Sequence, residues 1–265
     1  MRPESSAVVG TTVNDGGGLR LLGLTKRFGD LVAVRDLSIT VAPGEIYGLI
    51  GPNGSGKTTT VKMLTGLYRP TSGSIVVDGV DLARAPERAK RAMGYIPDEP
   101  FVYEKLSGRE FLHLMGELYG VPRPTRAVRI ERLLTLFPVS TVIDTRIESY
   151  SRGNKQKLII LAALLHEPRV LVVDEPIVGL DPESAMTTRE ILKSFAVGGG
   201  AALICTHTLG FAEAVCHRVG LLAEGVLVQE GDLRALRRAA GQADASLESL
   251  YLHFSRRGLR PGPLA

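Results

Sequence analysis

The stretch that decides the fold is Gly51-Pro52-Asn53-Gly54-Ser55-Gly56-Lys57-Thr58. It fits the pattern G-x-x-x-x-G-K-[ST], whose glycines let successive backbone N–H groups turn inward where a Cβ would clash. An apolar segment, residues 44–50, leads into it, and residues 57–67 are predicted to form the helix that follows. A strand, a glycine-rich loop and a helix in this order open an α/β nucleotide-binding fold.

The backbone N–H groups of this loop and the positive end of the following helix are suited to phosphates. In such loops the lysine, here Lys57, reaches the β- and γ-phosphates, and the hydroxyl of Thr58 can bind Mg²⁺. The sequence therefore predicts a bound nucleotide with Mg²⁺. The expected nucleotide contacts are Gly51, Pro52, Asn53, Gly54, Ser55, Gly56, Lys57, Thr58 and Thr59.

A pair of acids follows the apolar run Val170–Val173. Such a run is typical of a parallel strand covered on both faces, and ligands bind beyond the carboxyl ends of these strands. We assign Asp174 to the Mg²⁺ shell and Glu175 to the attacking water, as general base or as the group that positions it. An apolar run followed by two acids is a common pattern, and the phosphate loop upstream favours a function here.

Patterns around these motifs indicate the architecture. Residues 31–41 alternate apolar and polar, as an antiparallel strand does, and residues 74–77 with the turn Asp78-Gly79 predict another strand pair. A capping box at Ser107–Glu110 opens the first helix of a lobe within residues 98–165. The predicted fold is an α/β P-loop NTPase (RecA-like) core with an N-terminal antiparallel β subdomain and an inserted helical subdomain. Further elements are expected at residues 182–195 (helix), 201–205 (strand) and 218–230 (hairpin).

The expected domain limits follow from these patterns. Residues 1–18 are interpreted as a flexible N-terminus without a signal peptide, and residues 19–232 as the ATPase domain. Residues 233–265 are predicted to be a helical and basic tail, and we interpret it as a solvated tail rather than a binding site. The longest apolar run, residues 158–165, is far shorter than the roughly 20 residues of a spanning helix.

Composition excludes several classes of function. Hydrophobic residues make up 44% of the 265 residues, which is enough for a packed core. The net charge of +4 and the 5% aromatic content argue against a nucleic-acid partner. Cys205 and Cys216 form no metal or redox spacing, so we expect buried thiols.

Three more fragments fit one family when they are taken with the phosphate loop and the acid pair. The segment from Ser149 to Gln156, SYSRGNKQ, resembles the ABC signature, and Gly179-Leu180-Asp181-Pro182 resembles the D-loop of ABC ATPases. Cys205-Thr206-His207 resembles their switch histidine. The order and spacing also match, and the resemblance covers about residues 21–231.

The resemblance implies a site shared by two subunits. In ABC ATPases the signature of one subunit caps the γ-phosphate held by the other, so Ser151, Gly153 and the D-loop residue Asp181 are expected to contact the partner's ATP. His207 would contact the γ-phosphate and orient water with Glu175, although a histidine alone would be interpreted as a surface residue. Phe28 matches the aromatic residue that stacks on adenine, although alone it would be interpreted as a core residue.

The resemblance also implies the partners and the location. We expect a second ATPase subunit, identical or different, and an integral-membrane permease on a separate chain. The protein would then be cytoplasmic and peripheral on the inner face of the cell membrane. In the family the segment 98–105 lines the groove that receives a short helix of the permease, so Phe101 and Tyr103 would anchor it and Glu99 and Glu104 would pair with its basic residues. The alternative is that both aromatic side chains pack under the helical lobe.

Several positions depart from the family pattern. Tyr150, Arg152 and Asn154 replace the usual leucine, first glycine and glutamine of the signature. Asp98 stands where the family has the glutamine of the Q-loop, so it can offer an oxygen to Mg²⁺ but brings a charge. This combination of signature residues and an acidic Q-loop resembles the sequences of ABC-2-type exporters. The alternatives are an importer ATPase or a soluble ABC ATPase of the cluster-assembly kind, whereas a GTPase is disfavoured because no N-K-x-D motif occurs.

Overall fold

The structure is a computed structural model that describes residues 17–137, 139 and 141–258. Most of the N-terminal segment that we expected to be flexible, residues 1–16, lies outside the described residues. Among the described residues, none of the helices has both the length and the apolar character that crossing a bilayer requires.

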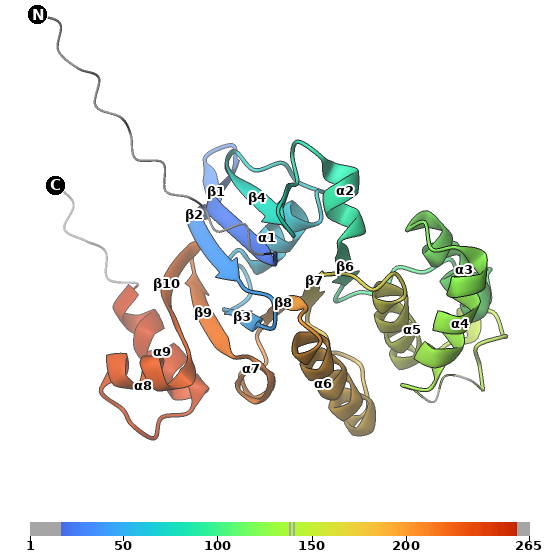
Figure 1. The fold of residues 1–265 in the computed structure, drawn as a ribbon. Coiled ribbons are helices and arrows are strands. Elements are labelled where there is room, and N and C mark those ends of the chain that lie inside the picture. Colours follow the sequence, from blue (N-terminus) through green and yellow to red (C-terminus); the bar gives the residue numbers. More distant parts are fainter. Residues whose placement is uncertain (1–16, 138, 140, 259–265) are drawn as a thin grey trace, which may run out of the picture.

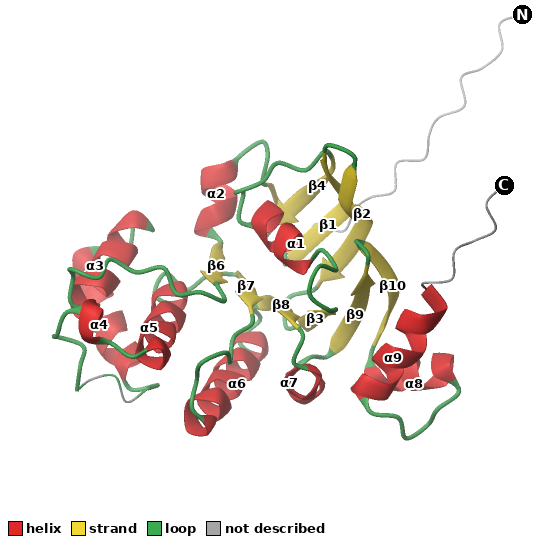
Figure 2. Ribbon diagram, turned by 180° about the vertical axis from the view of Figure 1, so that it is seen from behind, coloured by secondary structure: helices red, strands yellow, loops and turns green. Residues whose placement is uncertain are grey.

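A twisted, mostly parallel sheet forms the centre of the molecule (Figure 1). Its inner strands pair in parallel and are buried along their whole length, so the sheet is covered on both faces. Figure 2 shows α6 and α7 on one side of the sheet and α1 on the other. In spatial order the strands are β10 (Val226–Gly231), β9 (Arg218–Ala223), β3 (Ile46–Ile50), β8 (Ala201–Thr206), β7 (Val170–Asp174) and β6 (Met93–Ile96).

A second, antiparallel sheet covers the side of the core that carries α1 (Lys57–Leu64). Its apolar side chains share one core with α1 and the central sheet, through residues such as Leu19, Val34, Met63 and Val172. The α/β P-loop fold with an N-terminal antiparallel β subdomain is therefore confirmed. The strands lie in the order β2 (Leu31–Val41), β1 (Leu19–Phe28), β4 (Ser72–Val77) and β5 (Val80–Asp81), and α2 (Pro86–Arg91) follows them.

The inserted lobe is helical, as predicted, and its first helix begins at Gly108, directly after the N-cap Ser107 of the predicted capping box. The capping box is present, because Ser107 Oγ accepts the N–H of Glu110 and Glu110 Oε2 accepts the N–H of Ser107. The segment between β6 and this helix, residues 97–107, contains no helix. The lobe consists of α3 (Gly108–Leu118), α4 (Arg123–Leu134), the short 3₁₀ helix η1 (Ile147–Ser149) and α5 (Arg152–Leu164).

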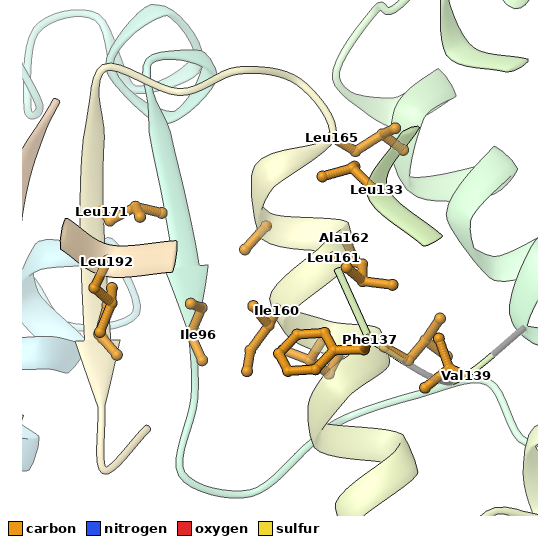
Figure 3. Close-up of a cluster of buried hydrophobic side chains, with 14 of the residues drawn as sticks. Ile96, Leu133, Phe137, Val139, Ile160, Leu161, Ala162, Leu165, Leu171 and Leu192 are labelled. Carbon is orange, nitrogen blue, oxygen red and sulfur yellow. The ribbon is translucent and has the colours of Figure 1, made fainter. Parts of the chain in front are cut away.

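A buried apolar cluster anchors this lobe to the sheet. Figure 3 shows Ile160 of α5 beside Ile96 of β6, with Leu171 of β7 and Leu192 of α6 on the other side of that strand. Phe137, which follows α4, packs into the same cluster. The lobe is therefore continuous with the core through α5.

The C-terminal region corrects one interpretation of the sequence. We interpreted residues 233–265 as a solvated tail, but Leu236, Leu247, Leu250 and Phe254 are buried against Leu221 and its neighbours. Their spacing puts them on the inner faces of two helices, and Arg237 is half-buried, with its Nε donating to the carbonyl oxygen of Ala245 at 2.9 Å. The remaining helices are α6 (Pro182–Val197), α7 (Leu209–Val215), α8 (Leu233–Ala240) and α9 (Leu247–Gly258).

A half-buried histidine, His166, joins the lobe to β6. The ring of His166 stacks on Tyr119 at a centroid distance of 3.8 Å, and its Nε2 lies 3.1 Å from the carbonyl oxygen of Met93. Burial lowers the pKa of His166 to about 4, and the charge of Arg129 acts in the same direction. The ring is therefore neutral in the folded protein at mildly acidic pH.

This histidine predicts a loss of stability in mild acid. The unfolded chain takes up a proton on His166 near pH 6.5, while the folded protein resists until about pH 4, so the free energy of unfolding falls between these values. We expect His166→Gln to remove about 2 kcal/mol of the loss between pH 7 and pH 5. Urea unfolding of both proteins at the two pH values measures this, and an equal loss in both would contradict it.

Candidate functional site

The predicted site residues gather at one edge of the central sheet. The phosphate loop follows β3, His207 follows β8, and Asp174 ends β7. These strands are neighbours and run parallel, so their carboxyl ends meet at the same edge.

The phosphate loop turns tightly between β3 and α1. A Cβ on Gly51 would lie 2.4 Å from the carbonyl oxygen of Leu222, and one on Gly56 would lie 2.6 Å from that of Ala33. Gly56 also has a φ of +107°, which side chains rarely allow. Only glycine fits these two positions, so the loop keeps its backbone open for a ligand.

Lys57 is nearly buried and folds back over this loop. Its Nζ donates to the carbonyl oxygens of Gly51 and Pro52, at 2.7 and 3.0 Å. Burial lowers the pKa of Lys57, and the nearby charges of Glu175 and Asp174 oppose that shift. The ammonium is thus placed at the mouth of the loop, where a phosphate would meet it.

A turn late in the chain supports the phosphate loop from outside. The N–H of Gly225 donates to the carbonyl oxygen of Ser55 at 2.9 Å, and the carbonyl of Gly225 accepts the N–H of Arg35 at 2.8 Å. Sequence analysis predicted the hairpin around Gly225 but not its place beside the loop. The hydroxyl of Ser55 is buried and has no hydrogen-bond partner among the described residues, so one polar atom of the loop is left for a ligand.

A pocket of about 810 Å³ opens in front of the loop. It is lined by Phe28 and the residues after it on one side, and by the loop and the start of α1 on the other. The structure therefore brings Phe28 to the same pocket as the phosphate contacts. The predicted contacts among its lining residues are Phe28, Asn53, Gly54, Gly56, Lys57, Thr58 and Thr59.

Phe28 is exposed rather than part of the core. Its side chain meets Tyr68 edge to face, with ring centroids 5.3 Å apart, and the ammonium of Lys26 lies 5.0 Å from its centroid. These neighbours hold the ring while its exposed fraction of 42% leaves a face open to a ligand.

Asp174 and Glu175 are both buried, but their environments differ. Burial raises the pKa of Asp174 to about 6, and the charges of Glu175 and Asp98 add to this shift. A buried carboxyl with unfavourable charge around it is suited to a cation. Asp174 and the hydroxyl of Thr58 are oxygen ligands of the kind that Mg²⁺ takes, so these residues fit that ion.

The Glu175 carboxylate is held by the end of β8. Its Oε2 accepts the hydroxyl of Thr206 at 2.7 Å, and its Oε1 lies 2.6 Å from Nδ1 of His207. The N–H of His207 also donates to Oε1 at 2.9 Å. The backbone of Glu175 has a φ of +46°, which is strained for a residue with a side chain. Sequence analysis missed Thr206, whose role depends on the pairing of β7 with β8.

The signature residues lie away from this pocket. Ser151 caps α5 by accepting the N–H of Asn154 at 3.2 Å, and Gly153 packs against the turn at Gly179. Asp181 caps α6, where its Oδ1 accepts the N–H of Ser184 at 2.8 Å. None of the contacts found among the described residues joins these groups to the phosphate loop of the same chain.

Asp98 lies between the two groups. Its charge acts on Asp174, as noted, and its Oδ1 is 3.9 Å from Nη2 of Arg152 at the start of α5. The prediction that Asp98 touches Mg²⁺ stays a prediction.

A phosphate loop on a parallel sheet, with an acid pair at the end of a neighbouring strand, defines the class of P-loop NTPases. A family model described as ABC transporter matches residues 34–178. The chain therefore belongs to the ABC transporter family, as an ATP-binding subunit, and it is an ATPase.

Individual relatives agree with this. The chain is 36% identical over 223 residues to the ABC-type transporter ATP-binding protein EcsA of Bacillus subtilis, covering 84% of this chain and 90% of that protein. It is 37% identical over 211 residues to the Nod factor export ATP-binding protein I of Burkholderia lata, covering 80% and 69%. A solved structure of the ATP-binding subunit of an ABC transporter has a TM-score of 0.86 and 34% identity, covering 89% of this chain and 99% of that one.

The placement of Lys57 predicts that Lys57→Ala loses tight ATP binding. The substitution removes the cation that pairs with the phosphates, and we expect affinity to fall by more than roughly tenfold. Equilibrium binding of labelled ATP measures this, with the exposed lysine variant Lys90→Ala as the control. Unchanged affinity in Lys57→Ala would overturn the role of the phosphate loop.

Proposed function

We propose that this chain is the ATP-hydrolysing motor of an ABC-2-type exporter, that it works as a dimer, and that it drives a separate integral-membrane permease. The observation that carries the proposal is the division of the site. Phe28 and the phosphate loop line the pocket, and Glu175 with His207 lies at the strand ends of the same sheet edge. Ser151 and Gly153 lie at the start of α5, outside the pocket. A second subunit has to supply the signature to complete each site.

The residues of the pocket and of the neighbouring strand ends divide the work of hydrolysis. Phe28 stacks on the adenine ring, and the loop with Lys57 holds the phosphates. Thr58 and Asp174 would hold Mg²⁺, which would neutralise phosphate charge. Glu175 positions the attacking water and accepts its proton, because its carboxylate lies beyond the strand end and is oriented by Thr206 and His207.

In a head-to-tail dimer the start of α5 would face the partner's γ-phosphate. Ser151 is exposed, and the first N–H groups of α5 point out of the helix end, which suits an anion. Asp181 begins α6 close to the same surface, because Lys157 of α5 donates to its Oδ2 at 3.2 Å. ATP then joins the two subunits, and its hydrolysis loosens them.

The segment 98–105 offers a surface for the permease. Phe101 and Tyr103 have exposed fractions of 78% and 51%, and their rings meet edge to face at 6.1 Å. This exposure favours a contact surface over packing under the lobe. Glu104 is already paired with Lys155 at 2.7 Å, so Glu99 is the acid of this segment that we retain for a partner.

The names of the relatives favour export. One is a Nod factor export ATP-binding protein, and another is the linearmycin resistance ATP-binding protein LnrL of Bacillus subtilis. By analogy with them, we propose that this chain serves an exporter. The subunit would be attached to its permease at the inner face of the cell membrane.

The role of Glu175 predicts that Glu175→Gln keeps ATP binding but loses turnover by roughly 10²–10⁴-fold, the range for a positioned acid–base group. The variant should also accumulate as an ATP-bound dimer, because the nucleotide that joins the subunits is no longer cleaved. Phosphate release and size-exclusion chromatography with ATP measure both, with Glu87→Gln on α2 as a control. A monomeric variant with full activity would rule out the role and the dimer.

The exposed aromatic pair predicts a separation of hydrolysis from coupling. The double variant Phe101→Ser, Tyr103→Ser should stay folded with near-normal ATPase activity, yet copurify weakly with the permease and transport poorly. Val128→Ser, which also removes an exposed apolar side chain of the lobe (72%), should leave both properties unchanged. Unfolding of the double variant, or normal transport, would count against the coupling surface.

A further inference from the structure

Two of the positions that depart from the family pattern are neighbours in space. Asp98 replaces the Q-loop glutamine, and Arg152 replaces the first glycine of the signature. The structure places Asp98 Oδ1 3.9 Å from Arg152 Nη2. One departure brings a negative charge to the nucleotide site, and the other brings the positive charge that faces it.

The position of Asp98 beside α5 is fixed by its surroundings. Gln156 of α5 is 1% exposed, and its Nε2 donates to the carbonyl oxygen of Pro97 at 3.2 Å. Lys155 of the same helix pairs with Glu104 at 2.7 Å. The backbone before and after Asp98 is therefore tied to the first turns of α5, and its carboxylate comes to Arg152 as a result.

The side chain of Arg152 also lies over the turn that follows the acid pair. A Cβ on Gly179 would come within 3.1 Å of Cδ and 3.2 Å of Nε of Arg152, and Gly179 has a φ of +78°. Arg152 therefore contacts the Q-loop segment and the Gly179 turn at once. A larger residue at Gly179 would displace it.

Besides Arg152, the expected Mg²⁺ site at Asp174 is a second place where a cation would attract Asp98. The strand before Asp98, β6, pairs in parallel with β7, and Ile96 lies opposite Val173, so Asp98 and Asp174 follow neighbouring strands at the same edge of the sheet. Mg²⁺ bound at Asp174 would attract the same carboxylate that Arg152 holds.

We propose that Arg152 is a positioning residue for Asp98: it holds the carboxylate at the start of α5, and binding of Mg–ATP opens this pair as Asp98 turns to the metal. This inference rests on the proposed function and on the prediction from the sequence that Asp98 offers an oxygen to Mg²⁺. The pair thereby links the arrival of nucleotide to the signature helix, because binding of Mg–ATP shifts Asp98 away from Arg152.

The size of the effect follows from the exposure of the pair. The two side chains are 55% and 46% exposed, so the pair is screened and its loss changes an equilibrium constant by roughly two- to fivefold. Arg152→Gln removes the cost of opening the pair, so we expect Mg–ATP to bind roughly two- to fivefold more tightly. Arg152→Lys keeps the positive charge, so this variant, unlike Arg152→Gln, should bind Mg–ATP with an affinity near that of the wild type.

A double-mutant cycle tests the proposal on the full chain. The affinity for ATP is measured by equilibrium binding, with Mg²⁺ and with EDTA, for the wild type, Arg152→Gln, Asp98→Asn and the double variant. We expect the gain from Arg152→Gln with Mg²⁺, its absence in the Asp98→Asn background and its absence in EDTA. High salt should reduce the gain, because it screens the exposed pair.

A matched pair elsewhere serves as the control. Lys193 and Glu190 on α6 form an ion pair of 3.4 Å with similar exposure, so Lys193→Gln should leave the affinity unchanged. An equal effect of Arg152→Gln in both backgrounds, or weaker binding of Mg–ATP, would overturn the proposal. If the wild type binds ATP and Lys57→Ala does not, such a result removes only the role of Arg152. If the wild type does not bind ATP, the proposed function itself fails.

Discussion

The parallel ladder that pairs β3 with β8 and β8 with β7 is the constraint on which the rest of the structure depends. Its register brings Asp174 beside Cys205, so that Glu175 meets Thr206 and His207 at the edge where the phosphate loop begins. A slip of one residue would turn each side chain to the opposite face. The strands are buried on both faces, and this burial is what makes such a slip costly.

The ladder also explains how two adjacent acids have different properties. Asp174 is the last residue of its strand and keeps no hydrogen-bond partner among the contacts described, so burial and neighbouring charge act on it fully. Glu175 leaves the strand with a positive φ, which turns its carboxylate toward three donors of the next strand end. Backbone strain at this position is thus compensated by hydrogen bonds, and the two carboxylates are directed to different tasks.

Sequence reasoning succeeded where the signal is local. The phosphate loop, the apolar run before Asp174 and the capping box at Ser107 each fit within a few residues, and the structure has each where it was predicted. It failed where a contact joins distant segments, as for Thr206 with Glu175, or Gly225 with the loop. The C-terminal helices were misread because their arginines dominate the pattern, while a few leucines decide the packing. The strand β6 is too short to show a period of its own.

The support that the Gly225 turn gives to the phosphate loop has a consequence for the order in which the chain is made. The loop is synthesised long before the hairpin, whose Gly225 N–H donates to the carbonyl oxygen of Ser55. Domains fold as their segments are synthesised. Until that hairpin exists, the loop lacks one wall of its ATP pocket, because Glu224 also lines it. The ATP pocket of the nascent domain is therefore complete only after the Gly225 turn has been synthesised.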